Sequence, residues 1–286
     1  MIRILQPGLE ATIQDLGRYG YAHLGVPRAG AADRSALLLA NRILGNAPGA
    51  AAIEFLLGGL ALQVDQDAVI AVTGAPVPIT VERRAVEINT AIHLQAGQTL
   101  TTGSAIYGLR SYLAVAGGID SLPVLGSRST DTTSGIGPLP LEQGTLLPVG
   151  ITRGPLPAAA DLAIENATAS SGIEVRYFDG PRADFFTSAA RREFAGAAWT
   201  VTTDINRVGA RLRGPALTYH ADRQLPSEGM VTGSVQVPGA GQPIVLLCNH
   251  GTTGGYPVIA VVHPKDIGKV AQVRPGATVR FRRITF

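Results

Sequence analysis

The sequence contains very little lysine. Lys265 and Lys269 are the only lysines among 286 residues. A phosphate-binding loop requires a lysine directly after a glycine run, and neither lysine has that context. A biotin carrier needs a lysine at the tip of a hairpin, and an amidase of the Ser-Ser-Lys type needs an N-terminal lysine. The scarcity of lysine excludes these three functions, and with them a covalent biotin on this chain.

Cysteine is even rarer. Cys248 is the only one in the sequence, which excludes an intrachain disulfide and zinc sites of the CxxC kind. This residue ends the apolar run "PIVLLC", which favours a buried, inert thiol over a nucleophile. No second histidine lies at a metal-ligand spacing from His250, so we predict no metal site.

Long apolar runs and basic tracts are also missing. No run approaches the ~20 apolar residues of a membrane-spanning helix. The first ten residues, "MIRILQPGLE", lack the pattern of a signal peptide. The net charge is +3, and no Lys/Arg tract is interleaved with aromatic residues. The sequence therefore predicts a soluble, cytoplasmic protein that binds neither nucleic acid nor membranes.

Glycine and proline, in contrast, are abundant. The 35 glycines and 19 prolines predict many turns, and the short apolar segments between them predict strands. The predicted strands cover residues 60–64, 68–74, 91–94, 111–118, 199–203, 243–248 and 258–263. This pattern predicts a mainly β fold with a few short helices, as in barrels and sandwiches.

Three segments have the periodicity of helices. Residues 33–44 have leucines and alanines spaced at three and four, with Asp33 or Ser35 as the possible N-cap. Residues 181–196 predict a second helix, and residues 263–273 a short third one.

The length of the chain and one segment without periodicity indicate two domains. Residues 151–172 are rich in Pro, Ala, Ser and Gly, which is typical of a linker. We therefore expect domains at residues 1–150 and 173–286.

A short motif recurs in both halves of the chain. It consists of an apolar residue, a tight glycine turn and a second apolar run, at residues 94–100, 141–147 and 273–281. The recurrence suggests two related β domains, although such hairpins are also common in unrelated β proteins.

Two long segments carry more polar residues than packing requires. Residues 14–33 place Arg18 and several aromatic side chains between glycines, and a long loop in a compact domain is often functional. Residues 204–238 contain Arg207, whose guanidinium suits a carboxylate or phosphate but also a solvated salt bridge. The same segment carries three further candidates for a binding site, Ser227, Glu228 and Gln236, although Ser227 and Glu228 also fit an N-cap.

The third polar segment is the turn at residues 249–257, which follows a predicted buried strand. Its candidate binding residues are Asn249, His250, Thr252, Thr253 and Tyr256. Gly254 and Gly255 are expected to adopt positive φ angles, and Pro257 to fix the turn. Such a turn would hold the threonine hydroxyls rigidly toward an anionic group. A well-satisfied structural turn is the alternative.

Together these segments resemble one protein family. The resemblance rests on "TIQDLGRYGYAHLGVPRAGAADRSALLLANRILGN", "YLAVAGGID", "VLGSRST", "PSEGMVTGSVQVP" and "TTGGYPVIAVV", and covers residues 2–283 in collinear order. The family is that of allophanate hydrolase subunit 2, also called the C subunit of 5-oxoprolinase or biotin-dependent carboxyltransferase-like. One relative forms part of the carboxyltransferase region of urea amidolyase.

The resemblance implies a fold, a partner and an activity. The fold would be two tandem cyclophilin-like β-barrel domains. The partner would be allophanate hydrolase subunit 1, also called the B subunit of 5-oxoprolinase, in a hetero-oligomer that the lactam-utilisation A subunit can join. The activity would be ATP-dependent hydrolysis of an amide, most simply 5-oxoproline to glutamate, with ATP a cofactor of the whole complex.

In that interpretation, the turn binds the lactam or its phosphate, and Arg18 or Arg207 binds the carboxylate. Two alternatives stay open: carboxyl transfer to urea or a similar amide with separate biotin partners, and a non-enzymatic antagonist that binds a kinase-inhibitor homologue. The sequence departs from the family at Asn249, where many relatives carry Asp. Asparagine keeps an acceptor oxygen but has neither the charge nor the basicity of a carboxylate.

Overall fold

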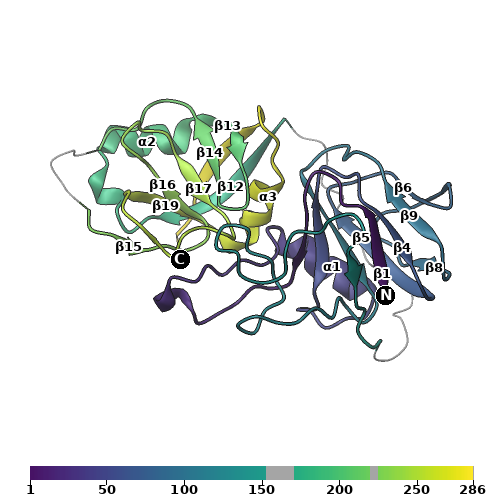
Figure 1. Ribbon diagram of the computed structural model, residues 1–286. Coiled ribbons are helices and arrows are strands. Elements are labelled where there is room, and N and C mark those ends of the chain that lie inside the picture. Colours follow the sequence, from purple (N-terminus) through teal and green to yellow (C-terminus); the bar gives the residue numbers. More distant parts are fainter. Residues whose placement is uncertain (153–170, 220–224, 286) are drawn as a thin grey trace. The chain divides into compact units, whose positions relative to one another are not determined.

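The fold is mainly β, as the sequence predicts. A computed structural model describes residues 1–152, 171–219 and 225–285. Within these ranges strands dominate and the three α-helices are short (Figure 1). The same ranges contain no helix that is both long and apolar enough to cross a membrane.

The described residues form two compact units. The first unit contains residues 1–19 and the chain from residue 29 up to the expected linker; the second contains residues 20–28 and the chain from residue 171 onward. Residues 20–28 thus group with the second unit, whereas the sequence interpretation placed them in the domain at 1–150. Most of the linker predicted at residues 151–172 lies outside the described residues.

The first unit consists of two antiparallel sheets and one helix. Its elements are β1 Ile2–Gln6, β2 Ala11–Gln14, α1 Arg34–Ile43, β3 Ala52–Leu56, β4 Ala61–Val64, β5 Ala68–Gly74, β6 Ile79–Val81, β7 Arg84–Val86, β8 Ile92–Leu94, β9 Thr99–Thr102, β10 Arg110–Val115 and β11 Leu146–Leu147. One sheet has the order β11-β1-β4-β9-β6-β7 and the other β2-β3-β10-β5-β8. These strands form two open sheets where the family resemblance implies a barrel.

Helix α1 begins where the sequence predicts. The Asp33 carboxylate accepts hydrogen bonds from the backbone N–H groups of Ser35 (3.1 Å) and Ala36 (3.2 Å), which satisfies two N–H groups of the first turn. The backbone N–H of Asp33 in turn donates to the buried Tyr112 hydroxyl (2.7 Å). Asp33 is therefore the N-cap, and it also ties α1 to the sheet of β10.

The second unit contains a closed barrel. Its elements are η1 Ala22–Leu24, β12 Gly172–Asp179, η2 Ala183–Phe185, α2 Ser188–Gly196, β13 Ala198–Ile205, β14 Gly209–Arg213, β15 Glu228–Gly229, β16 Ser234–Gln236, β17 Ile244–Leu246, β18 Thr253–Gly254, β19 Val258–Val262, η3 Pro264–Asp266, α3 Ile267–Gln272 and β20 Thr278–Arg283. The barrel order is β12-β19-β16-β17-β14-β13-β20 (Figure 1, green to yellow). Parallel pairing of β12 with β20 closes it.

Two predicted helices are shorter than expected. The segment 181–196 divides into η2 and α2, because Thr187 interrupts the helix with an extended backbone and caps α2 by accepting from Ala190 N–H (3.1 Å). The segment 263–273 similarly divides into the 3₁₀ turn η3 and the single short helix α3.

The recurring motif forms the same turn three times. Gly97, Gly144 and Gly276 have φ angles of 83°, 87° and 86°. Each turn is closed by a backbone hydrogen bond over three residues, such as Gln98 N–H to Gln95 C=O (3.0 Å). Left-handed φ angles are adopted readily by glycine alone, which explains why this residue recurs in the motif.

A buried carboxylate joins β12 to the η3–α3 segment. Asp266 accepts from the backbone N–H (2.9 Å), Nε (2.7 Å) and Nη2 (3.0 Å) of Arg176, and Lys269 Nζ lies 3.0 Å from its Oδ1. Burial opposes ionisation of this carboxyl, but the bonds from Arg176 and Lys269 outweigh burial and hold the pKa of Asp266 well below 3.8. Because the folded pKa is depressed, the stabilisation is complete above the unfolded pKa and is lost as the pH falls below it.

We therefore expect Asp266→Asn to lower the free energy of unfolding at pH 7 by about 2 kcal/mol. The difference from the unmodified protein should shrink as the pH falls below about 4. Urea unfolding at both pH values measures it. Glu174→Gln, which removes an exposed ion pair to Arg282, is the control and should change stability by less than about 0.5 kcal/mol. Equal losses in the two variants would contradict the prediction.

Candidate functional site

The polar turn that follows β17 has a buried beginning and an exposed end. Asn249 and His250 are buried, whereas Thr253 and Tyr256 are exposed and Thr252 is half-buried. The backbone folds back at this point, because the N–H of His250 donates to the carbonyl of Leu247, three residues earlier (3.2 Å). The turn thus presents a threonine and a tyrosine above a buried polar layer.

The buried layer is a pair formed by Arg207 and Asn249. Nη2 of Arg207 donates to Oδ1 of Asn249 (3.1 Å), and the backbone N–H of Asn249 donates to the carbonyl of Arg207 (2.9 Å). Arg207 is only 4% exposed, so this arginine is not the solvated residue that the sequence allowed. Its acceptor at Asn249 is neutral, so this bond orients the guanidinium without neutralising its charge.

His250 is held in a single tautomer. Its Nδ1 lies 2.7 Å from the carbonyl oxygen of Gly251, which can only accept a hydrogen bond, so Nδ1 carries the proton. Burial lowers the pKa of His250 and Arg28 lowers it further, while the Gly251 bond acts in the opposite direction. The ring is therefore neutral at pH 7, with its Nε2 lone pair available.

A second short strand pair supports the exposed half of the turn. β15 pairs with β18, with Glu228 opposite Gly254, and the N–H of Met230 donates to the carbonyl of Thr252 (2.9 Å). Nε of Arg182 donates to the carboxylate of Glu228 (2.8 Å). Glu228 is therefore a strand residue that Arg182 anchors, rather than part of an N-cap.

Gln236 of β16 lies directly behind the turn. Its Nε2 is 3.3 Å from the Met230 sulfur and 3.5 Å from the carbonyl of Tyr256. A Cβ atom added at Gly254 would lie 2.4 Å from the same Nε2. Gly254 is therefore required by the close approach of Gln236.

The predicted positive φ angles of the turn glycines are wrong. Neither Gly254 nor Gly255 adopts a left-handed φ, and a Cβ atom at Gly255 would meet nothing within 4 Å. The bend is made instead by the short pairing of β15 with β18. Position 255 therefore has no backbone requirement for glycine, and of the two only Gly254 is sterically restricted.

The structure brings most of the predicted site residues together, but not all. Arg207, Asn249 and His250 form the buried layer, and Thr252, Thr253, Tyr256, Glu228 and Gln236 form or support the turn above it. Ser227 precedes β15 on the exposed surface. Arg18 belongs to the first unit, whereas the turn belongs to the second.

Two residues near the turn were not predicted. Arg28 influences His250 from 222 positions earlier, because residues 20–28 belong to the second unit, and Arg182 binds Glu228 across 46 positions. Both lie in polar or helical segments that the sequence identified. Without knowledge of the topology, however, no local pattern connects either residue with its partner.

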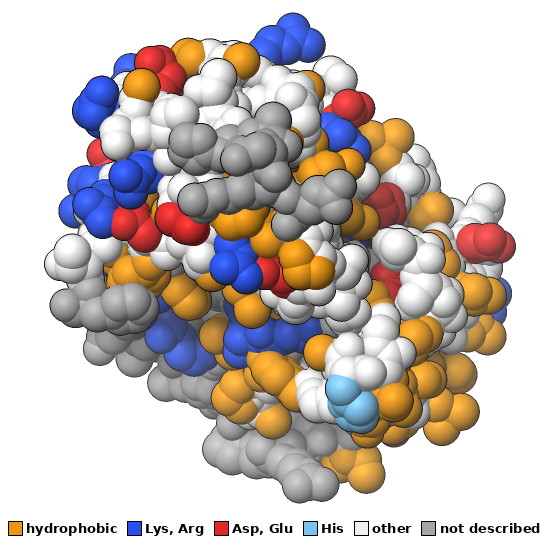
Figure 2. Space-filling view, turned by 90° about the vertical axis from the view of Figure 1, so that its left-hand side faces the viewer, with side chains coloured by type: hydrophobic (Ala, Val, Ile, Leu, Met, Phe, Trp, Pro, Cys, Tyr) orange, Lys and Arg blue, Asp and Glu red, His pale blue; other side chains and the backbone are white. Residues whose placement is uncertain are grey.

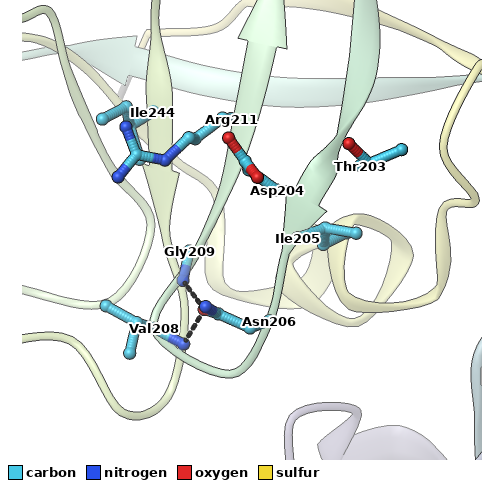
Figure 3. A pocket seen from close by; sticks show the side chains of 8 residues that line it. All are labelled: Thr203, Asp204, Ile205, Asn206, Val208, Gly209, Arg211 and Ile244. Carbon is cyan, nitrogen blue, oxygen red and sulfur yellow. Dashed lines mark hydrogen bonds between the residues drawn. The ribbon is translucent and has the colours of Figure 1, made fainter.

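A surface cavity of about 390 Å³ lies beside the segment that carries Arg207 (Figure 3). Asp204 and Arg211 line it, and Asn206 accepts from the N–H groups of Val208 (2.8 Å) and Gly209 (3.2 Å). These bonds stabilise the β13–β14 turn and so hold Arg207. Among the described residues, no group of three His, Cys, Asp or Glu side chains could hold a metal ion.

Comparison with known proteins places the chain in a family. Residues 24–283 match the model of the carboxyltransferase domain, subdomain A and B. The chain is 39% identical to the C subunit of 5-oxoprolinase from Escherichia coli K12, covering 98% of this chain and 90% of that protein. It is 30% identical to urea amidolyase of Saccharomyces cerevisiae, covering all of this chain but 17% of that protein. The crystal structure of K. lactis urea amidolyase superposes with a TM-score of 0.93 at 29% identity, over 99% of this chain and 19% of that one. The chain therefore belongs to the carboxyltransferase family of subdomains A and B.

Proposed function

We propose that this chain is one subunit of a hetero-oligomeric, ATP-dependent enzyme that converts 5-oxoproline to glutamate. One observation carries the proposal: the chain matches the stand-alone C subunit of 5-oxoprolinase over nearly the full length of both proteins, at 39% identity. The partner is a homologue of the B subunit of 5-oxoprolinase, and a lactam-utilisation subunit completes the complex. Hydrophobic side chains are exposed in several places on the face drawn in Figure 2, in keeping with a chain that binds partners.

In this proposal, the turn binds the lactam. Arg207 lies at the turn with a neutral partner, so its positive charge suits the carboxylate of 5-oxoproline. The neutral His250 offers an acceptor for the lactam N–H, and Thr253 offers an exposed hydroxyl to a carbonyl or phosphoryl oxygen.

ATP does not fit the residues of this turn. The turn contains no lysine, and Lys269 is bound to Asp266 and to the carbonyl of Glu174. We therefore assign ATP to the complex and derive no step through it on this chain.

The test is reconstitution. The purified subunits are mixed with ATP and 5-oxoproline, and glutamate is measured with and without this chain. We expect glutamate formation to require it. Unchanged turnover in its absence would refute the proposal.

Carboxyl transfer to urea or a similar amide is the second candidate, favoured by the family model and by the TM-score of 0.93 to K. lactis urea amidolyase. This activity needs biotin partners from other chains. Excess avidin distinguishes the two, because it should abolish carboxyl transfer and leave 5-oxoproline hydrolysis unchanged.

Thr253→Val tests the exposed half of the turn. The substitution keeps the size of the side chain but removes its hydroxyl, and Thr253 is exposed, so we expect kcat/KM to fall roughly tenfold while Tm stays unchanged. Thr203→Val, at an exposed threonine of β13, is the matched control and should change neither quantity. Full activity of Thr253→Val would indicate a structural turn. A loss of activity with an intact complex would argue against a purely non-enzymatic antagonist.

A further inference from the structure

The first unit contains a buried arginine whose donors are not all used. Arg18 is only 2% exposed, and its Nη2 donates to the carbonyl of Ser129 (2.5 Å). Its Nε and Nη1 are buried and have no acceptor among the described residues. Leaving buried donors of a charged group without acceptors costs several kcal/mol, so native structures normally provide an acceptor.

The nearby carboxylates are bonded to other donors. Asp15 accepts from the hydroxyls of Ser127 and Ser129 (2.6 Å each), from the N–H of Gly17 (2.7 Å) and, at Oδ2, from the N–H of Arg128 (2.6 Å). These bonds satisfy the Asp15 carboxylate and fix the backbone of Ser129 beneath Arg18.

Asp131 is also engaged elsewhere. It accepts from the N–H of Thr133 (3.0 Å) and the hydroxyl of Ser134 (2.5 Å). Burial lowers the pKa of Arg18, while Asp131 and Asp15 raise it through space. Within the described part of the chain, no carboxylate oxygen lies within 4 Å of the Arg18 guanidinium. The cation is thus buried without a direct ion pair.

The surrounding backbone is arranged closely around this guanidinium. Gly137 has a φ of 93°, and a Cβ atom there would lie 2.2 Å from the carbonyl oxygen of Ser129 and 3.0 Å from Nη2 of Arg18. Gln14 Oε1 and Thr130 Oγ1, beside the same segment, are likewise buried without a partner in the described ranges. The unsatisfied polar atoms therefore concentrate around Ser129 and Thr130.

We infer that Arg18 is the anchor of a binding site for a small carboxylate in the first unit. A carboxylate supplies acceptor oxygens to Nε and Nη1 and the negative charge that the buried guanidinium lacks within hydrogen-bonding distance. The segment that runs from Asp131 to Gly137 covers the site, and its residues 132–135 are exposed, so displacement of this segment gives access. The inference does not depend on the proposed function, because it rests on the first unit alone.

The probe is sodium acetate added to the full-length chain, with sodium chloride at equal ionic strength and neutral acetamide as comparisons. The arginine Nε–H resonances are followed by ¹H–¹⁵N NMR, and Tm is measured in parallel. We expect acetate to shift one Nε–H resonance saturably and to raise Tm, both in the unmodified protein and in Arg42→Met, an exposed arginine of α1. Arg18→Met should lose the resonance, the shift and the rise in Tm. If Arg18→Met does not fold, Arg18→Lys replaces it, since lysine also lacks the Nε–H.

Three outcomes would overturn the inference. The first is the absence of a saturable shift, which would leave water as the acceptor. The second is an equal response to chloride or to acetamide, which would exclude a specific carboxylate site. The third is a shift that persists in the Arg18 variant, which would place the acetate elsewhere.

Discussion

Replacement of Arg207 by methionine is expected to lower the kcat/KM of the reconstituted complex by at least ~100-fold. Arg207 is buried, and its Nη2 donates to Asn249 at 3.1 Å, so its guanidinium is already positioned for an incoming carboxylate. Methionine fills similar volume but donates no hydrogen bond. The loss of a charge-assisted bond in a desolvated site costs about 3 kcal/mol, which corresponds to roughly two orders of magnitude in rate.

The matched control is Arg211→Met. Arg211 lies on the neighbouring strand β14, where its side chain faces the surface cavity (Figure 3). Its replacement removes the same charge from the same unit, and we expect kcat/KM to change less than about twofold. Both variants are measured for glutamate formation and for Tm. If they lose activity equally, the effect comes from the net charge of the unit, and Arg207 has no specific role in substrate binding.

Local patterns were sufficient to predict the individual elements of the fold. β5 spans residues 68–74, as the apolar run indicates, and α1 begins after Asp33 because this side chain caps its first turn. The three glycine turns were predictable for the same reason, since a left-handed φ at Gly97, Gly144 or Gly276 is a property of a few neighbouring residues. The mainly β fold followed from these local signals.

Sheet closure and unit membership could not be predicted in this way. The pairing of β12 with β20, which closes the barrel, joins residues that are about a hundred positions apart. Residues 20–28 belong to the second unit although the first unit surrounds them in the sequence. Neither feature has a local pattern, because both depend on contacts between distant segments.

The candidate site shows the same limit. The sequence identified Arg207 and Asn249 separately, as polar residues beside glycines, but only the antiparallel pairing of β14 with β17 brings their segments together. The prediction for Gly254 was correct in requiring glycine and wrong in its reason. The requirement is the close approach of Gln236, which lies 18 positions earlier on another strand.

Asp15→Asn is expected to lower the free energy of unfolding of the first unit by about 3 kcal/mol. The Asp15 carboxylate accepts four hydrogen bonds, two of them from serine hydroxyls and two from backbone N–H groups. An asparagine amide has one oxygen and one NH₂ group. In either orientation, its NH₂ group therefore faces at least one buried N–H or hydroxyl donor, such as the N–H of Arg128. The decrease in Tm should be roughly 10 °C.

Asp120→Asn provides the matched control, because it removes the same charge from an exposed carboxylate of the same unit. Asp120 contacts Nη2 of Arg128 at 2.7 Å, but its side chain is 58% exposed. Such a surface ion pair contributes about 0–1 kcal/mol, so the Tm of this variant should fall by no more than a few degrees. The two variants therefore separate the number of satisfied donors from the loss of one charge. Equal shifts would show that the four bonds to Asp15 add nothing beyond its charge, and the fixed position of Ser129 beneath Arg18 would then need another cause.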